Sequence, residues 1–184
     1  MKCVTECYYI KSKILEYFDN YKRMVFGNMY FRMYNPAKDC VICNYTEEDW
    51  SFIFKGVDED ELKKLSVCTN VIILLWCDVD TDNPHGMIYL VESHIHPCEV
   101  SFHGGTWNHD SKFYFRLYYS LSNLMSFLLK IGAQIKTTCA IDNTKAKKIL
   151  RSLGFEETHR DSELIYKALD LKKFEQSSIV RRMQ

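Results

Sequence analysis

The sequence has no excess of charge of either sign, because 24 Lys and Arg residues are balanced by 24 Asp and Glu residues. This absence argues against a nucleic-acid or membrane-surface binder, which needs a basic excess. Proline and glycine are also scarce, at 3 and 7 of 184 residues, so there is little room for long flexible linkers. Hydrophobic residues make up 47% of the chain. We therefore expect one compact globular domain.

Long hydrophobic runs are missing as well. The longest, residues 71–77, is far shorter than the roughly 18 residues that a membrane span requires. No apolar stretch follows Lys2, so we expect no signal peptide at the N-terminus. The eight cysteines are then expected to be free thiols in a reducing compartment, and we predict a cytoplasmic protein without a membrane partner.

Hydrophobic periodicity and turn residues predict an alternation of helices and strands. The expected helices are residues 8–25, 57–65, 114–129 and 143–153, and the expected strands are 28–34, 71–78, 87–94, 99–103, 134–141 and two within 155–168. Residues 71–78 lack polar alternation, which is typical of a strand buried on both faces. The strands of 71–103 form an antiparallel meander, whereas the long helix after residue 103 is a crossover that makes the next strand parallel. The fold class is therefore mixed α/β, with one largely antiparallel sheet flanked by helices. We expect a helical extension (1–27) packed on the core, a domain (28–170) and a charged tail (171–184) that frays.

One pattern near the C-terminus is specific. Asn143, Ala146 and the pair Gly154-Phe155 have the spacing of the final helix of the GNAT N-acetyltransferase superfamily, which the chain resembles over residues 28–170. The predicted order of strands and helices is similar to that of the same superfamily. Residues 100–107 resemble the cofactor strand of a divergent branch that phages and prophages often carry. The resemblance implies a GNAT-like acyl-CoA N-acyltransferase fold, in which one parallel strand pair is splayed apart.

The resemblance also implies acetyl-CoA as co-substrate, with its pantetheine arm lying between the strands 99–103 and 134–141. Splaying leaves backbone N–H and C=O groups without partners. A freed N–H near Phe102 or Gly104 would polarise the thioester carbonyl. Asn143 and Ala146, at the start of the last motif helix, would hold the pantetheine, although Asn143 is also a good ordinary helix N-cap.

Two departures from the family pattern concern phosphate binding and protonation. The family's glycine-rich phosphate loop is reduced here to Gly104 and Gly105, which would equally suit a turn at the end of a strand. We expect the N-terminus of the long helix, with Lys112, to hold the diphosphate. The basic face of helix 143–153 could meet the 3′-phosphate. Leu150 occupies the position where the family often has a tyrosine general acid.

The candidate catalytic residues lie on one strand. Glu99, Ser101 and His103 share one face of the predicted strand. An amine acceptor must lose a proton before it attacks, and a histidine titrates near neutral pH. We expect His103 to be the base, with Glu99 orienting it or relaying the proton. A solvent-facing histidine at a strand end is the plain alternative.

A metal site is the weaker interpretation of the cysteines. Cys40 and Cys43 form a lone Cys-x-x-Cys pair, and His94, His96 and Cys98 offer further ligands. A structural zinc site usually shows two paired clusters at recognisable spacing. Because these groups are far apart in the sequence, we expect ordinary thiols and no metal.

The predicted function is direct transfer of an acetyl group from acetyl-CoA to an amine, on a small molecule or a peptide. The alternative is a GNAT-like fold that has lost catalysis and serves as a binding or structural module, including a phage-related one. The sequence indicates neither the acceptor nor the oligomeric state.

Overall fold

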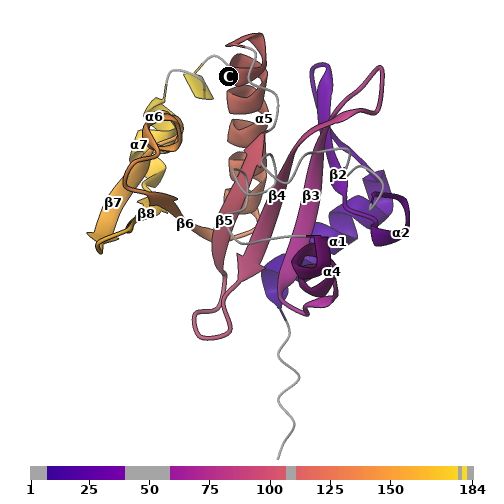
Figure 1. Ribbon diagram of the computed structural model, residues 1–184, viewed down its shortest axis with the longest axis horizontal. Coiled ribbons are helices and arrows are strands. Elements are labelled where there is room, and N and C mark those ends of the chain that lie inside the picture. The colour runs from indigo at the N-terminus through magenta and orange to yellow at the C-terminus, as the bar shows by residue number, and fades with distance from the viewer. Residues whose placement is uncertain (1–7, 40–58, 107–110, 178–179, 182–184) are drawn as a thin grey trace, which may run out of the picture.

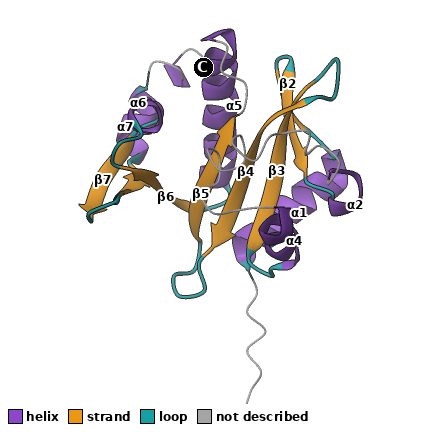
Figure 2. Cartoon of the chain, viewed as in Figure 1, coloured by secondary structure: helices purple, strands orange, loops and turns teal. Residues whose placement is uncertain are grey.

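A computed structural model describes residues 8–39, 59–106, 111–177 and 180–181. Within this part of the chain, one mixed sheet of eight strands carries helices on both faces (Figures 1 and 2). The helices are α1 (Tyr9–Tyr21), α2 (Pro36–Asp39), α4 (Glu59–Val67), α5 (Ser111–Lys130), α6 (Thr144–Ser152) and α7 (Leu171–Gln176). The strands are β1 (Met24–Phe26), β2 (Met29–Met33), β3 (Val71–Asp78), β4 (Pro84–Glu92), β5 (Glu99–Thr106), β6 (Gln134–Ala140), β7 (Phe155–Arg160) and β8 (Leu164–Leu169).

The strand order is β1-β2-β3-β4-β5-β6-β8-β7. All neighbouring strands are antiparallel except β5 and β6, which run parallel. Helix α5 makes the crossover between those two strands, as the sequence predicts. A connection between parallel strands has to carry the chain back to the end of the sheet where the first strand began. The predicted mixed α/β class, with a meander followed by one parallel pair, is confirmed.

The core has one hydrophobic layer on each face of the sheet. Strand β3 supplies both layers, since every residue from Val71 to Cys77 is buried. On one face, α1 and α5 pack side chains such as Phe18 and Leu124 against the sheet. On the other face, Leu62 of α4 packs in a smaller layer. The burial of β3 on both faces agrees with its uninterrupted apolar sequence.

The first helix is shorter than its sequence pattern predicts. It ends at Tyr21, and Lys22 follows with a φ of 59°, which breaks the helical path. Val25 lies in β1 and is 55% exposed rather than on the buried stripe. A two-residue turn, Gly27-Asn28, joins β1 to β2, with Gly27 at a φ of 61°. Such a turn needs a residue that tolerates positive φ, and Gly27 provides it. The predicted boundary between residues 27 and 28 therefore falls within a hairpin.

The meander strands differ from prediction at their ends. Strand β4 ends at Glu92, so His94 lies in the following loop. Strand β5 continues to Thr106, so Gly104 and Gly105 are strand residues and not a turn. A Cβ on Gly104 would lie 2.6 Å from the carbonyl oxygen of Met87 on β4. The absence of a side chain at Gly104 is therefore what allows the two strands to approach this closely.

The segment after residue 170 does not fray throughout. Asp170 caps α7 by accepting a hydrogen bond from the Lys173 N–H at 2.9 Å. Phe174 of the same helix is buried in the main core. The backbone of Phe174 lies close to Gly154: a Cβ added to Gly154 would be 2.5 Å from the Phe174 nitrogen. Residues 171–176 are thus held by packing rather than by their charged sequence.

Candidate active site

The parallel pair β5–β6 stops pairing after a short stretch. Its register consists of Glu99 with Gln134, Val100 with Ile135 and Ser101 with Lys136. Both strands continue well beyond these pairs, to Thr106 and Ala140, but they diverge (Figure 1). The gap between splayed strands that the sequence resemblance implies is therefore present.

The hydrogen-bond pattern shows which backbone groups of β5 face the gap. The Ser93 N–H donates to the Glu99 carbonyl at 2.9 Å, so odd-numbered residues of β5 direct their backbone groups to β4. Even-numbered residues then point toward β6, as the bond from the Gln134 N–H to the Cys98 carbonyl confirms. Gly104 is the first of this set whose N–H lies beyond the paired stretch.

The backbone groups of β6 alternate in the same way. The Ile141 N–H donates to the Glu163 carbonyl at 3.0 Å, in register with the antiparallel pairing of β6 and β8. Odd-numbered residues of β6 thus bond to β8, and even-numbered residues face β5. The N–H and C=O of Thr138 consequently lie beyond the last β5–β6 pair and are directed into the gap.

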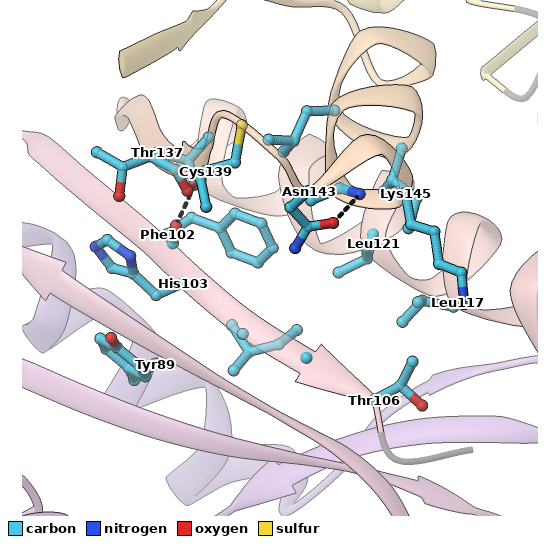
Figure 3. A pocket seen from close by; sticks show the side chains of 18 of the residues that line it. Tyr89, Phe102, His103, Thr106, Leu117, Leu121, Thr137, Cys139, Asn143 and Lys145 are labelled. Carbon is cyan, nitrogen blue, oxygen red and sulfur yellow. Dashed lines mark hydrogen bonds between the residues drawn. The ribbon is translucent and has the colours of Figure 1, made fainter. Parts of the chain in front are cut away.

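A cavity of about 350 Å³ occupies the region between the splayed strands and helices α5 and α6. On the helix-covered face its wall is apolar, with Phe102, Leu117 and Leu121 (Figure 3). On the opposite face its wall carries His103 and Tyr89. The cavity therefore connects an apolar channel on one side of the sheet with a polar end on the other.

Most of the residues predicted for the site line this cavity. They are Phe102, His103, Gly104, Gly105, Asn143 and Ala146. Glu99 does not, and the side chain of Lys112 lies outside the described part of the chain. Leu150 also lines the cavity and is buried, so the position where the resembling family often has a tyrosine contributes only apolar surface here.

Asn143 is a helix cap whose amide also reaches the cavity. Its side-chain Oδ1 accepts a hydrogen bond from the Ala146 N–H at 2.9 Å at the start of α6. The ordinary N-cap interpretation is therefore confirmed. The cap uses only the oxygen, and the Nδ2 group is directed toward the cavity (Figure 3). Capping and ligand binding are thus compatible at this residue, because they use different atoms.

His103 is stacked against an aromatic ring rather than exposed at a strand end. It lies directly opposite Tyr89 on β4, with ring centroids 4.9 Å apart and an interplanar angle of 18°. Burial lowers the pKa of His103 and raises the pKa of Tyr89, since both charged forms lose hydration. Burial thus favours the neutral form of both side chains, and the neutral imidazole is the form that can accept a proton.

Glu99 lies too far along the strand to act on His103 directly. Its carboxylate forms an ion pair with Lys136 Nζ at 2.5 Å, at the closed end of the parallel pair. Four residues of extended strand separate it from His103 by about 13 Å. In the continued register, Thr138 is the residue across the gap from His103. Thr138 also lines the cavity, and the sequence offers no signal for it.

The basic face of α6 contributes one lysine to the cavity wall. Lys145 lines the cavity (Figure 3), whereas Lys147 Nζ donates to the Ile141 carbonyl at 2.6 Å and ties the helix to the end of β6. Lys148 and Arg151 are exposed. Lys145 is therefore the cation of this helix that is best placed to meet an anionic ligand.

The cysteines that the structure describes are free thiols, which are either buried or partly buried. Cys77 and Cys139 are buried, as predicted, and burial raises the pKa of the Cys77 thiol to about 11. Cys40 and Cys43 lie outside the described residues. Among the described residues, no three His, Cys, Asp or Glu side chains are grouped closely enough to hold a metal ion. His94 instead forms a hydrogen bond with the Tyr8 hydroxyl at 2.5 Å.

The helices of the described ranges include none that is long and apolar enough to span a membrane. In sequence, the chain matches no protein-family model and no curated protein.

In structure, the chain is similar to several acetyltransferases. A probable GNAT-family acetyltransferase from Chromobacterium violaceum matches with a TM-score of 0.68 and 10% identity, over 84% of this chain and 88% of that one. Apo FdhC, a nucleotide-linked sugar GNAT, matches with a TM-score of 0.63 and 18% identity, over 87% and 96%. Mutant forms of the spermidine/spermine N-acetyltransferase SpeG from Vibrio cholerae match with a TM-score of 0.61 and 14% identity, over 86% and 100%.

These similarities show that the chain has the fold of GNAT acetyltransferases. The identities are too low to carry an activity or an acceptor from those proteins to this one. The expected affinity with a phage-carried branch finds no support among them and stays a prediction.

Proposed function

We propose that the protein transfers an acyl group, acetyl in the first instance, from acyl-CoA to an amine by direct attack. The observation that carries the proposal is the gap between β5 and β6, where pairing ends at Ser101 and Lys136 and a cavity lies beyond. Unpaired backbone groups in a cavity need hydrogen-bond partners. A pantetheine arm, with its two amides, supplies donors and acceptors in an extended chain.

The residues around the gap suit such an arm. Gly104 and Thr138 direct backbone N–H and C=O groups toward it from opposite strands. The Nδ2 group of Asn143 provides a further donor from α6. The N–H of Gly104 is the natural partner for the thioester oxygen, and a donor aimed at a developing oxyanion is typically worth about 3 kcal/mol. Acyl-CoA would supply the activated acyl group.

His103 is the proposed base. An amine acceptor is largely protonated at neutral pH, so a group at the acceptor end of the cavity must take its proton before the nitrogen can attack. The lowered pKa of His103, caused by burial, keeps the imidazole neutral and able to do so. The stacked Tyr89 ring holds the imidazole plane in place. Glu99 is retained only as a distant influence, since it is paired with Lys136.

A binding or structural module is the second candidate. It is favoured by Leu150, which offers no proton to the departing thiolate, and by Gly104 and Gly105, which lie within strand β5 and do not form the glycine-rich phosphate loop of the resembling family. The structurally similar acetyltransferases named for a nucleotide-linked sugar and for spermidine differ in acceptor. We therefore propose only an amine of a small molecule or peptide as acceptor. We place the protein in the cytoplasm, where thiols remain reduced.

The two candidates differ in CoA binding and turnover. Calorimetric titration with CoA and acetyl-CoA should give saturable binding, and release of the CoA thiol should be detected with a panel of primary amines. Binding without thiol release for any amine would favour the module. No binding of either compound at millimolar concentration would refute the enzymatic proposal.

A further inference from the structure

Thr137 lies at the point where the parallel strands separate. It stands opposite Phe102 in the register that the three β5–β6 pairs define, one position beyond the last of them. The residue is 4% exposed, and its Oγ1 donates a hydrogen bond to the Phe102 carbonyl at 2.6 Å (Figure 3). This bond joins two strands across 35 residues of sequence.

The bond replaces the next backbone bond of the sheet. Phe102 is even-numbered, so its carbonyl points toward β6, and in a continued parallel ladder it would accept from the Thr138 N–H. The Thr137 hydroxyl takes that acceptor instead. A hydroxyl has one proton to donate, and its other nearby acceptor, the Thr138 carbonyl, is 3.4 Å away. The shorter bond is therefore the one that counts.

We propose that Thr137 is a positioning residue that ends the β5–β6 pairing and so holds open the gap between these two strands. Its hydroxyl satisfies the buried carbonyl of Phe102, which removes the need for the strands to pair further. The N–H of Thr138 stays directed into the cavity, where the extended arm of a bound cofactor can accept a hydrogen bond from it. Identifying the arm as pantetheine rests on the proposed acyl transfer, whereas the role of Thr137 in strand separation does not.

The test compares two substitutions that differ in the hydroxyl. Thr137→Val keeps the shape of the side chain but removes the donor, and Thr137→Ser keeps the donor but removes the methyl group. In the valine variant the Phe102 carbonyl is left without its partner in a buried place. The nearest replacement donor is the Thr138 N–H, and bonding to it would close the gap by one pair.

The first readout is hydrogen exchange at the Thr138 amide, followed by NMR without ligand. We expect fast exchange in the natural protein and in Thr137→Ser, and protection by at least tenfold in Thr137→Val. The second readout is calorimetric CoA affinity. If the open form falls to about one tenth of the population, the apparent Kd rises about tenfold. The serine variant should restore the natural affinity, and KM for acetyl-CoA should rise in the valine variant more than kcat falls.

Unchanged exchange at Thr138 in Thr137→Val would overturn the proposal, as would equal loss of CoA affinity in the serine and valine variants. If the valine variant does not fold, Thr137→Ala replaces it, because it also lacks the hydroxyl and leaves room in place of the methyl groups. If the natural protein fails to bind CoA, the acyl-transfer proposal fails. The exchange measurement still tests Thr137 in that case.

Discussion

Asn143 provides the sharpest test of the carrier site, because its two side-chain atoms have different expected roles. The Oδ1 atom caps α6 through the Ala146 N–H at 2.9 Å, and the Nδ2 group faces the cavity. Asn143→Ser retains a capping oxygen without the amide nitrogen, whereas Asn143→Ala removes both. Comparing the two variants separates helix stability from ligand binding.

The expected magnitudes follow from these contacts. Loss of an N-cap costs about 1 kcal/mol of unfolding free energy, and exchange among good caps costs a few tenths. Loss of one hydrogen bond to a ligand costs roughly 0.5–1.5 kcal/mol, which is about a 2- to 12-fold rise in Kd. Asn143→Ser should therefore fold with nearly natural stability and bind CoA about 2- to 12-fold more weakly. Asn143→Ala should bind CoA as weakly as Asn143→Ser, and its free energy of unfolding should also fall by about 1 kcal/mol.

Urea denaturation measures the free energy of unfolding, and calorimetric titration measures the Kd for CoA. Asp170 provides the matched control, since its carboxylate caps α7 through the Lys173 N–H at 2.9 Å and does not line the cavity. Asp170→Ala should cost about 1 kcal/mol without changing CoA affinity. Natural CoA affinity in Asn143→Ser would refute the reasoning and leave Asn143 as a helix cap alone.

Three further predictions concern the base, the strand contact and a buried thiol. Burial lowers the pKa of His103, so kcat/KM should fall as pH drops through a midpoint below 6.5; His103→Ala should lose that limb and about 10²- to 10⁴-fold in rate, and an unchanged pH–rate profile would exclude it as base. Gly104→Ala would place a Cβ 2.6 Å from the Met87 carbonyl oxygen. Thermal melting should therefore show that the free energy of unfolding falls by about 1–3 kcal/mol, and CoA should bind more weakly. Gly132→Ala is the control: its Cβ would meet open space but its φ is +90°, so this variant should lose stability while keeping its CoA affinity. Cys77 is buried with a pKa of about 11, so mass spectrometry should find it unmodified after iodoacetamide treatment of the native protein at pH 8, and rapid labelling would contradict its burial.

The elements that the sequence predicts best are those whose signal is local. Residues 71–78 match β3 because an apolar run without alternation suits a strand buried on both faces. The start of α6 follows from Asn143, whose capping oxygen acts within one turn of helix. The end of α1 was missed because the apolar spacing continues to Val25, although a Gly-Asn turn makes residues 24–26 a strand.

Other features depend on a neighbouring segment that local sequence does not reveal. Gly104 and Gly105 look like a turn in isolation, yet Gly104 is a strand residue whose missing side chain accommodates the Met87 carbonyl. Glu99 shares a strand face with His103, as alternation requires, but its nearest charge is Lys136 on the adjacent strand. Phe174 is held in the core by contacts that its charged local sequence does not indicate.

The sequence by itself determined that β5 and β6 are parallel. The long helix between them brings the chain back to the end of the sheet at which β5 begins, so the next strand runs in the same direction. It also determined which side chains share a face of β5, because alternation is a property of one strand. Only the tertiary structure decided where the two strands part, since that point depends on Thr137 meeting the carbonyl of Phe102 across 35 residues. The stacking of His103 on Tyr89 was decided in the same way. The extent of the β5–β6 pairing depends on contacts between segments that are distant in the sequence, and no local pattern encodes it.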